Sequence, residues 1–177
     1  MPTMFKVSVL IATMVSAATL AAGQCAAAGA RDACQLLKAE TVAKVIGKPV
    51  ASLDYGGTCA YFPPEPGAAT PKQIVAKMRS GEVDIYLEVT PTWQGGKQAA
   101  TDAVAEAKSS LHAVPGIADA AWVSTSVSDH ALVRKADVLV QINMALIPGM
   151  PTLMQKRDIA GLRQRFEPMA REVAASL

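Results

Sequence analysis

The residues most able to do chemistry in this sequence are a serine, an aspartate and a histidine that stand side by side, Ser128, Asp129 and His130. These are the side chains of a hydrolytic triad, in which the histidine takes the serine proton and the carboxylate orients the histidine. A triad requires the three groups to converge in space, whereas neighbouring residues on a strand point to opposite sides. The spacing therefore favours a turn and the start of a strand at this point.

A hydrolytic site could instead be assembled from residues that are scattered along the chain. The candidates for such a site are His112, His130, Asp119 and Glu88. A histidine within hydrogen-bond reach of a carboxylate inside a pocket would support this alternative, because general acid–base catalysis needs that contact.

The stretch EVDIYLEVT, residues 82–90, alternates apolar and polar side chains and predicts a half-buried strand with one solvated face. Glu82, Asp84 and Glu88 are then expected on one face of the sheet together with Tyr86. Paired carboxylates can do acid–base work, but they are also the usual side chains of a solvated face, which is the interpretation we favour.

Two other patterns could carry chemistry but match their templates poorly. Gly95–Gln98 reads GGKQ, which lacks the upstream glycine and the Ser or Thr of a phosphate-binding loop and predicts only the start of a helix. A metal site is not expected, because Cys34 and Cys59 do not form a CxxC pair and the two histidines lie far away in sequence. No cofactor is predicted.

Trp93 and Trp122 are the largest apolar side chains, and both are candidates for lining a ligand pocket. Trp122 is expected in the core, whereas Trp93, between Pro91 and Gly95, could line a pocket or lie exposed at a strand end.

Cationic side chains are too few and too dispersed for a nucleic-acid interface, which requires clustered Lys and Arg. The formal net charge is +2. The cations near the C-terminus are expected on a solvated helix face, and they are Lys156, Arg157, Arg163 and Arg165.

The N-terminus indicates export. Lys6 is followed by a short apolar segment and then by small residues, which is the pattern of a signal peptide over residues 1–30. Cleavage after Ala28 or Ala30 would remove Cys25, and residues 31–177 would form a single domain without a transmembrane span. Two alternatives are a retained N-terminal anchor and lipidation of Cys25, for which Gln24 is an unfavourable preceding residue.

The cysteines that remain in such an exported chain are Cys34 and Cys59. Two cysteines in an oxidising compartment predict a disulfide, with two free buried thiols as the alternative. Early cleavage would also allow a Cys25–Cys34 bond, which would leave Cys59 unpaired.

The apolar patterns that must position these residues predict an α+β domain. The expected order is a helix that stops at Gly47, two or three strands, a helix over residues 95–114 with Leu111 on its buried side, three strands and a final helix. Residues 73–80 fit either a helix or a strand. Pro168 must kink the final helix or start a second helical segment. Regular alternation of strand and helix is missing, so an antiparallel sheet of about five or six strands with helices packed on it is predicted.

The segments ACQLLKAETVAKVIGKPV, GGTCAYF, VPGIADAAW and ALVRKADVLVQI follow one another at distances that resemble those in a group of small bacterial envelope proteins. Many proteins of that group are lipoproteins, and their function is unknown. The resemblance implies a Mog1/PsbP-like α/β/α sandwich and an envelope location, but no catalytic residue. The usual second glycine of the Gly–Leu–Gly–Asp turn is replaced here by Ala118.

These patterns together predict an exported periplasmic or secreted protein that binds a protein partner or a small or lipidic ligand without catalysis. The alternatives are a periplasmic hydrolase and a structural accessory of an envelope complex. A ligand binder requires a cavity of about 300 Å³ or more, and an accessory requires an exposed apolar patch of several hundred Å².

Overall fold

The computed structural model describes residues 32–64, 67, 69–107, 110–124, 129–144 and 159–177. The helical elements are η1 (Ala33–Gln35, a 3-10 turn), α1 (Ala39–Ile46), α2 (Pro71–Ser80), α3 (Gly96–Ala107) and α4 (Ile159–Ser176). The strands are β1 (Ala51–Tyr55), β2 (Thr58–Phe62), β3 (Leu87–Thr92), β4 (Leu111–Ala113), β5 (Ala120–Ser124), β6 (Asp129–Lys135) and β7 (Val138–Met144).

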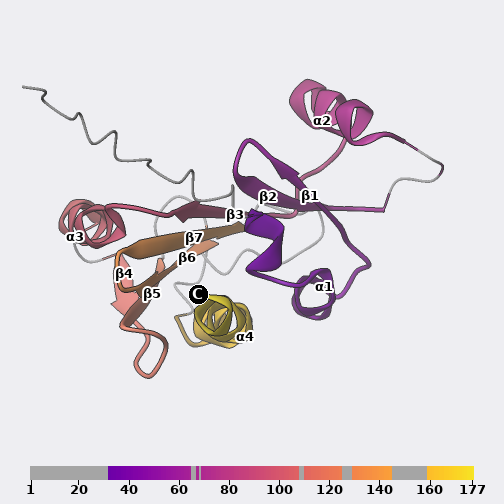
Figure 1. Ribbon diagram of the computed structural model, residues 1–177. Coiled ribbons are helices and arrows are strands. Elements are labelled where there is room, and N and C mark those ends of the chain that lie inside the picture. Colours follow the sequence, from indigo (N-terminus) through magenta and orange to yellow (C-terminus); the bar gives the residue numbers. More distant parts are fainter. Residues whose placement is uncertain (1–31, 65–66, 68, 108–109, 125–128, 145–158) are drawn as a thin grey trace, which may run out of the picture.

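The strands form one antiparallel sheet in the order β1-β2-β3-β7-β6-β5-β4. The predicted α+β class is confirmed, and the sheet has seven strands instead of the five or six expected. The helices lie on both sides of the sheet, with α1 and α4 on one side and α2 and α3 on the other (Figure 1). None of the helices in the described segments is long and apolar enough to cross a membrane.

The sheet face under α4 carries the main core. Alternate residues of the strands point to this face because side chains on a strand have a period of two. The strand residues of this core are Cys59, Tyr61, Leu87, Val89, Ala121, Val123, Ala131, Val133, Val140, Ile142 and Met144. The helix contributes Phe166, Met169, Ala170 and Val173 at intervals of three and four, as its sequence pattern predicts.

The opposite face carries two smaller clusters, one at each end of the sheet. Ala60, Phe62 and Val83 pack with Met78 of α2, while Leu132 and Leu139 pack with Ala100 of α3. Helix α2 begins at a capping box, in which the Thr70 hydroxyl accepts from the Gln73 N–H and the Gln73 side chain accepts from the Thr70 N–H. The two helices therefore cover the ends of this face separately.

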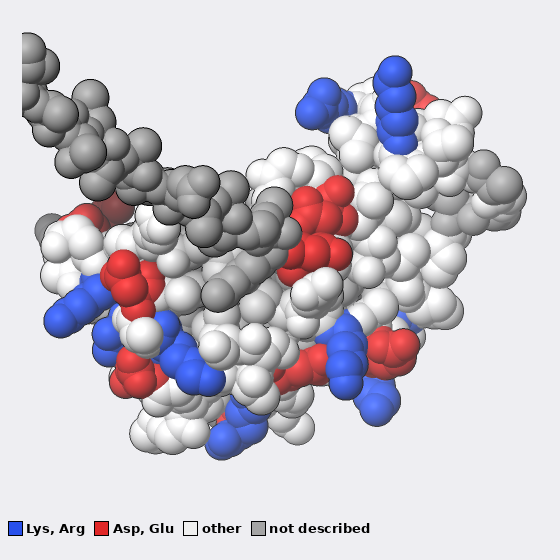
Figure 2. All heavy atoms as spheres, in the orientation of Figure 1, with Lys and Arg blue, Asp and Glu red and all other residues white. Residues whose placement is uncertain are grey.

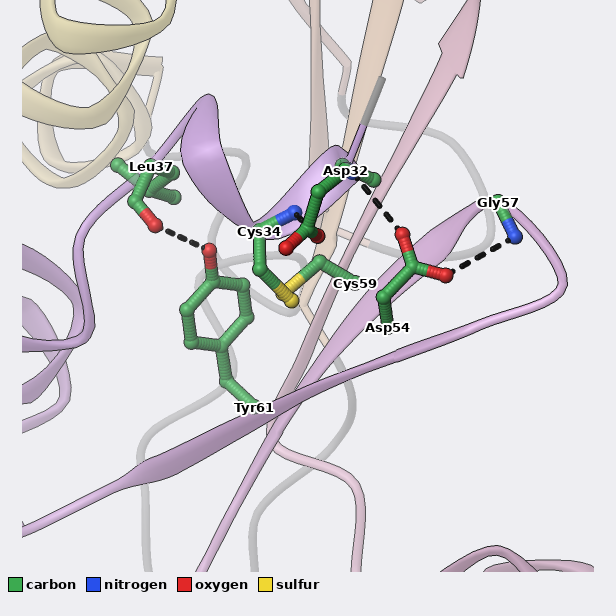
Figure 3. The surroundings of a disulfide bond; sticks show 8 residues. Asp32, Cys34, Leu37, Asp54, Gly57, Cys59 and Tyr61 are labelled. Atoms are coloured by element: carbon green, nitrogen blue, oxygen red, sulfur yellow. Dashed lines mark hydrogen bonds between the residues drawn. A yellow bond between two sulfur atoms is a disulfide. The ribbon is translucent and has the colours of Figure 1, made fainter. Parts of the chain in front are cut away.

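A disulfide joins Cys34 of η1 to Cys59 of β2, with 4.9 Å between the two Cα atoms (Figure 3). Asp54 holds the same turn, since its carboxylate accepts from Ala33 N at 3.0 Å and from Gly57 N at 3.2 Å. The buried Tyr61 hydroxyl donates to the Leu37 carbonyl, and burial is the main reason that the pKa of Tyr61 is raised. The disulfide attaches the start of the described chain to the sheet. Residues 1–31, including Cys25, lie outside the described residues.

The predicted strand over residues 82–90 is partly wrong, because the observed strand begins only at Leu87. The chain changes face at Tyr86, which is buried in the main core, whereas Val83 belongs to the cluster under α2. Glu82 lies just beyond α2 and accepts a hydrogen bond from Ser80 at 2.6 Å. Glu88 is the one carboxylate of the predicted row that lies on the strand.

Two further expectations need correction. The helix predicted after Gly95 ends at Ala107, and Leu111 lies in β4 instead of on the helix. Of the two expectations for Pro168, the start of a second helix is wrong, because α4 continues from Ile159 to Ser176.

Candidate functional site

A groove of about 620 Å³ lies between α1 and α4. We call it the α1–α4 groove. The residues that line it are Thr41, Lys44, Val45, Gly161, Gln164, Arg165 and Pro168.

Helix α1 presents three of these residues because of its short amphipathic sequence. Val42 and Ile46, four positions apart, point into the core, and the adjacent stripe then carries Thr41, Lys44 and Val45. The helix ends where Gly47 adopts a left-handed conformation with φ of 73° and donates to the Ala43 carbonyl at 2.8 Å. This glycine stop was predicted from the sequence and is confirmed.

Helix α4 forms the other wall with a stripe at positions i, i+3, i+4 and i+7. The stripe consists of Gly161, Gln164, Arg165 and Pro168, beside the stripe that packs into the main core. Pro168 has no N–H, so the Gln164 carbonyl lacks the donor that a helix normally supplies four residues later. The groove therefore has a main-chain acceptor in one wall that is not used by the regular helical ladder.

The charged groups of the groove are both positive. Lys44 is exposed, and Arg165 is half-buried with its Nη1 atom 3.5 Å from the Met144 sulfur. Val45 and the Pro168 ring supply apolar surface between them. Because no carboxylate is among the described lining residues, the groove is suited to an anion that also has an apolar part.

The sequence predicts that the C-terminal arginines lie on a solvated helix face, and this is only partly correct. Besides Arg165, Arg163 is half-buried, and its Nη2 atom donates to the Ala113 carbonyl at 2.8 Å. Arg171 contacts the same connection between β4 and β5, donating to the Gly116 carbonyl at 3.3 Å. Lys156 and Arg157 lie outside the described residues.

The two tryptophans are placed in different environments. Trp93 follows β3 and packs against the main core. Trp122 lies on β5 and lines a second cavity, of about 330 Å³, beneath α3. Of the two pocket candidates, Trp122 therefore lines a cavity, whereas Trp93 packs on the main core.

The candidate hydrolase residues do not converge as a group. Glu88 and His130 both pair with Asn143 from opposite sides, so they share one face of the sheet two strands apart. His112 pairs with Val123, whose side chain belongs to the main core on the other face. Asp119 accepts from the main-chain N–H of Ala136 at 2.7 Å, in the turn at the far end of the β6–β7 hairpin.

Glu88 has a firm structural partner, because the hydroxyl of Tyr55 donates a hydrogen bond to it. Burial of Tyr55, helped by this contact with Glu88, raises the pKa of Tyr55 to about 12. The pair lies on the sheet face between the α2 and α3 clusters. Of the adjacent Ser–Asp–His residues, Ser128 lies outside the described residues, and Asp129 and His130 begin β6 as expected.

The GGKQ segment holds an internal carboxylate where a phosphate loop would hold a ligand. Asp137, in the turn between β6 and β7, accepts from Gly95 N at 2.8 Å and from Lys97 N at 3.2 Å. These two N–H donors lower the pKa of Asp137. Gly96 donates to the Asp137 carbonyl at 2.8 Å, so the start of α3 is fixed to the hairpin.

Among the described residues, no group of three or more His, Cys, Asp and Glu side chains gathers as metal ligands. Charged side chains of both signs are interspersed on the face of the molecule shown in Figure 2.

Comparison of the chain with protein-family models, with curated proteins and with solved structures finds no match. The resemblance to bacterial envelope proteins therefore stays a prediction from the sequence.

Proposed function

We propose that the protein is exported and binds a small amphipathic anion in the α1–α4 groove, without catalysis. The observation that carries the proposal is the meeting of Lys44 and Arg165 with the apolar surfaces of Val45 and Pro168 in one groove. A volume of about 620 Å³ lies within the range of about 300–1,000 Å³ that is usual for small-molecule sites.

The chemistry of the groove indicates a linear ligand with one acidic end. A carboxylate or phosphate monoester would receive hydrogen bonds from Arg165 and Lys44, which are fully charged at neutral pH. An alkyl chain would cover Val45 and the Pro168 ring and remove their apolar surface from water. This ligand class is a sharper form of the small or lipidic ligand expected from the sequence.

Two alternatives have less support. The hydrolase would need its histidine and carboxylate in contact, and only His130 and Glu88 of the four candidates share a face, with Asn143 between them. An accessory subunit would need a large apolar patch, and Val104 is the one large hydrophobic side chain among the described residues that is exposed.

Export is supported by the disulfide and by the N-terminal composition. Disulfides persist in oxidising compartments and are rare in the cytosol. The envelope location that the family resemblance implies agrees with this, and lipidation of Cys25 is the anchored form of the same proposal.

The ligand proposal is tested by isothermal titration calorimetry of the purified protein with decanoate and decyl phosphate, with decanol as the uncharged control. Binding of both anions but not of decanol is expected. Lys44→Gln and Arg165→Gln are each expected to weaken binding about three- to tenfold, the effect of one partly exposed charge-assisted hydrogen bond. Lys72→Gln, an exposed cation at the start of α2, serves as the matched control.

Gly161→Leu is a second variant, because it adds a side chain to the wall of the groove without altering a charge. The Gly161→Leu variant is expected to lose binding of both anions while its circular dichroism spectrum remains that of a folded protein. Unchanged affinity in the glutamine variants and in Gly161→Leu would contradict the proposed site, and no binding of either anion would contradict the ligand class.

The export proposal is tested by intact mass of the protein purified from a bacterial host that secretes it. A chain that starts at Gly29 or Arg31 and gains two alkyl groups only after reduction is expected. A chain that starts at Cys25 and carries added acyl mass would replace the free form with the lipid-anchored form. A full-length chain would contradict cleavage.

A further inference from the structure

A second cavity lies on the other side of the sheet, between α3 and strands β5 and β6, and has a volume of about 330 Å³. Its helical wall is again a stripe at positions i, i+3 and i+7, formed by Lys97, Ala100 and Val104. Its sheet wall includes Trp122 and Arg134. Helix α3, which lines this cavity, lies on the opposite side of the seven-stranded sheet from α1 and α4, which line the groove (Figure 1).

The walls of this cavity are held rigidly. The Asp137 carboxylate and carbonyl fix the first turn of α3, as described above. Gly96 packs so closely on β7 that a Cβ atom there would lie 2.3 Å from the Leu139 main-chain nitrogen. A wall fixed in this way needs little ordering when a ligand binds, which favours affinity.

The apolar part of the cavity is suited to a flat ring. Trp122 is half-buried and presents an aromatic surface, and the small side chains of Ala100 and Ala120 leave room beside it. Val104, on the helix, is 37% exposed, although valine on a helix facing a sheet would normally be covered. An aromatic ring bound here would contact both Trp122 and Val104 and exclude water from them.

The polar part of the cavity is cationic. Arg134 lies diagonally across from Trp122, because Ala120 pairs with Arg134 and Trp122 pairs with Leu132. Arg134 is half-buried as a residue, and no hydrogen bond or ion pair between described residues uses its guanidinium. Lys97 lies at the same cavity, and no carboxylate is among the described lining residues. Arginine can bind a carboxylate through two parallel hydrogen bonds.

We propose that this cavity is a second binding site, specific for a small aromatic carboxylate. The ring lies between Trp122 and Val104, and the carboxylate binds Arg134, with Lys97 adding positive charge. The ligand differs from that of the α1–α4 groove because this cavity is about half as large and contains an indole wall instead of an aliphatic one.

The test is a titration of the ¹⁵N-labelled protein with 2-naphthoate, followed by NMR through the indole N–H signals of the two tryptophans. The chain has two tryptophans, so Trp122→Phe assigns both signals. A saturable shift of the Trp122 signal with little change at Trp93 is expected. The uncharged 2-naphthamide is expected to bind with an affinity at least about tenfold lower.

Three variants make the result decisive. Arg134→Gln and Val104→Glu are expected to weaken naphthoate binding about tenfold or more, the first by removing the cation and the second by placing a like charge at an exposed position. Arg79→Gln, an exposed cation on α2, is the matched control and should bind as the wild type does. A Trp122 signal that does not respond, or equal affinity in Arg134→Gln and the wild type, would overturn the site.

The outcome is independent of the α1–α4 groove. The Lys44→Gln/Arg165→Gln variant should bind naphthoate normally even if it no longer binds decanoate. If decanoate displaces naphthoate and reverses the shift of the Trp122 signal, the Trp122 cavity is not a separate site.

Discussion

The two faces of the sheet are built differently. The face under α4 carries one continuous aliphatic core that extends across the sheet from Cys59 to Val123 and is closed by Phe166 and its neighbours. The opposite face has two separate clusters, under α2 and under α3, with polar residues such as Glu88 and Asn143 on the strands between them. The first face therefore supplies most of the stability, because burial of apolar area is the dominant favourable term in folding.

This difference bears on where ligands can bind. The α1–α4 groove lies at the margin of the continuous core, where α1 meets α4. The split face needs a specific device to hold α3 on the sheet, since its cluster is small, and the contact of Asp137 and Gly96 provides that device. Stability and cavity formation are thus assigned to different parts of one sheet.

The largest effect is expected for Phe166→Ala, which removes a fully buried ring from the continuous core. We expect a loss of about 3–5 kcal/mol in the free energy of unfolding, the usual cost of Phe→Ala in a core. Urea denaturation followed by circular dichroism measures this loss.

Leu132→Ala, in the cluster under α3, is the matched variant on the other face. Its loss should lie near the lower end of the range for buried leucines, about 2 kcal/mol, because the adjacent cavity lets the site relax. A larger loss for Leu132→Ala than for Phe166→Ala would contradict the division between the faces.

The next effect is expected from removal of the disulfide by Cys34→Ala with Cys59→Ala. The bond closes a loop with a sequence separation of 25, which corresponds to roughly 3–4 kcal/mol on the chain-entropy account. Thermal unfolding of the double variant measures the change. Reduction of the wild-type protein should reproduce the same loss, and no change in either experiment would mean that Asp54 and Tyr61 alone hold the η1 turn.

A smaller effect is expected for Gly96→Ala. The added Cβ would lie within 2.6 Å of main-chain atoms of residues 137–139, which cannot move aside as a side chain can. Overpacking of this kind usually costs about 1–3 kcal/mol. Denaturant unfolding measures the cost, and Gly95→Ala does not serve as control because Gly95 has φ of 72°. Ala105→Gly, at an exposed position on the same helix, controls for helix propensity, at about 1 kcal/mol.

The smallest effect is expected for Asp137→Asn, and it should depend on pH. The folded-state pKa of Asp137 is lowered, chiefly by the Gly95 and Lys97 N–H donors, from its ordinary value of 3.8. Its contribution to stability is therefore complete above that value and is lost as the pH falls through the lower folded-state pKa. The difference in melting temperature between the wild type and Asp137→Asn should shrink below about pH 4. A difference that stays constant to pH 2.5 would contradict this role of the carboxylate.

The sequence was sufficient for the fold class and for several local features, and the reasons are physical. The apolar stripe of Phe166, Met169 and Val173 on α4 repeats often enough to be recognised. Gly47 marks the end of α1 because glycine readily adopts the left-handed conformation that ends a helix. The Cys34–Cys59 bond followed from counting cysteines in a chain predicted to be exported. These features depend on neighbours in sequence or on simple arithmetic.

Other elements were missed for equally specific reasons. Strand β4 has three residues and cannot show a period, so Leu111 was assigned to the preceding helix. The apolar pattern of residues 73–80 fits either a helix or a strand, and only the Thr70–Pro71–Gln73 capping signal identifies helix α2. The switch of face at Tyr86 depends on packing against both sides of the sheet and has no local signature.

The candidate site was the least predictable part. Lys44 and Arg165 are ordinary helix residues. They line one groove only because the fold brings together α1 and α4, which are far apart in sequence. Trp122 was identified as a pocket residue from its size, but its partner in the cavity is Arg134 and not Trp93. Cavities of this kind arise from tertiary packing, which cannot be recognised from local patterns in a single sequence.

Backbone ¹H–¹⁵N chemical-shift mapping during a decanoate titration tests whether the α1–α4 groove binds an amphipathic anion. Saturable shifts confined mainly to residues 41–45 and 161–168 are expected, with the α3 residues 97–104 unaffected. Shifts concentrated elsewhere, or the same shifts with uncharged decanol, would contradict binding of an amphipathic anion in this groove.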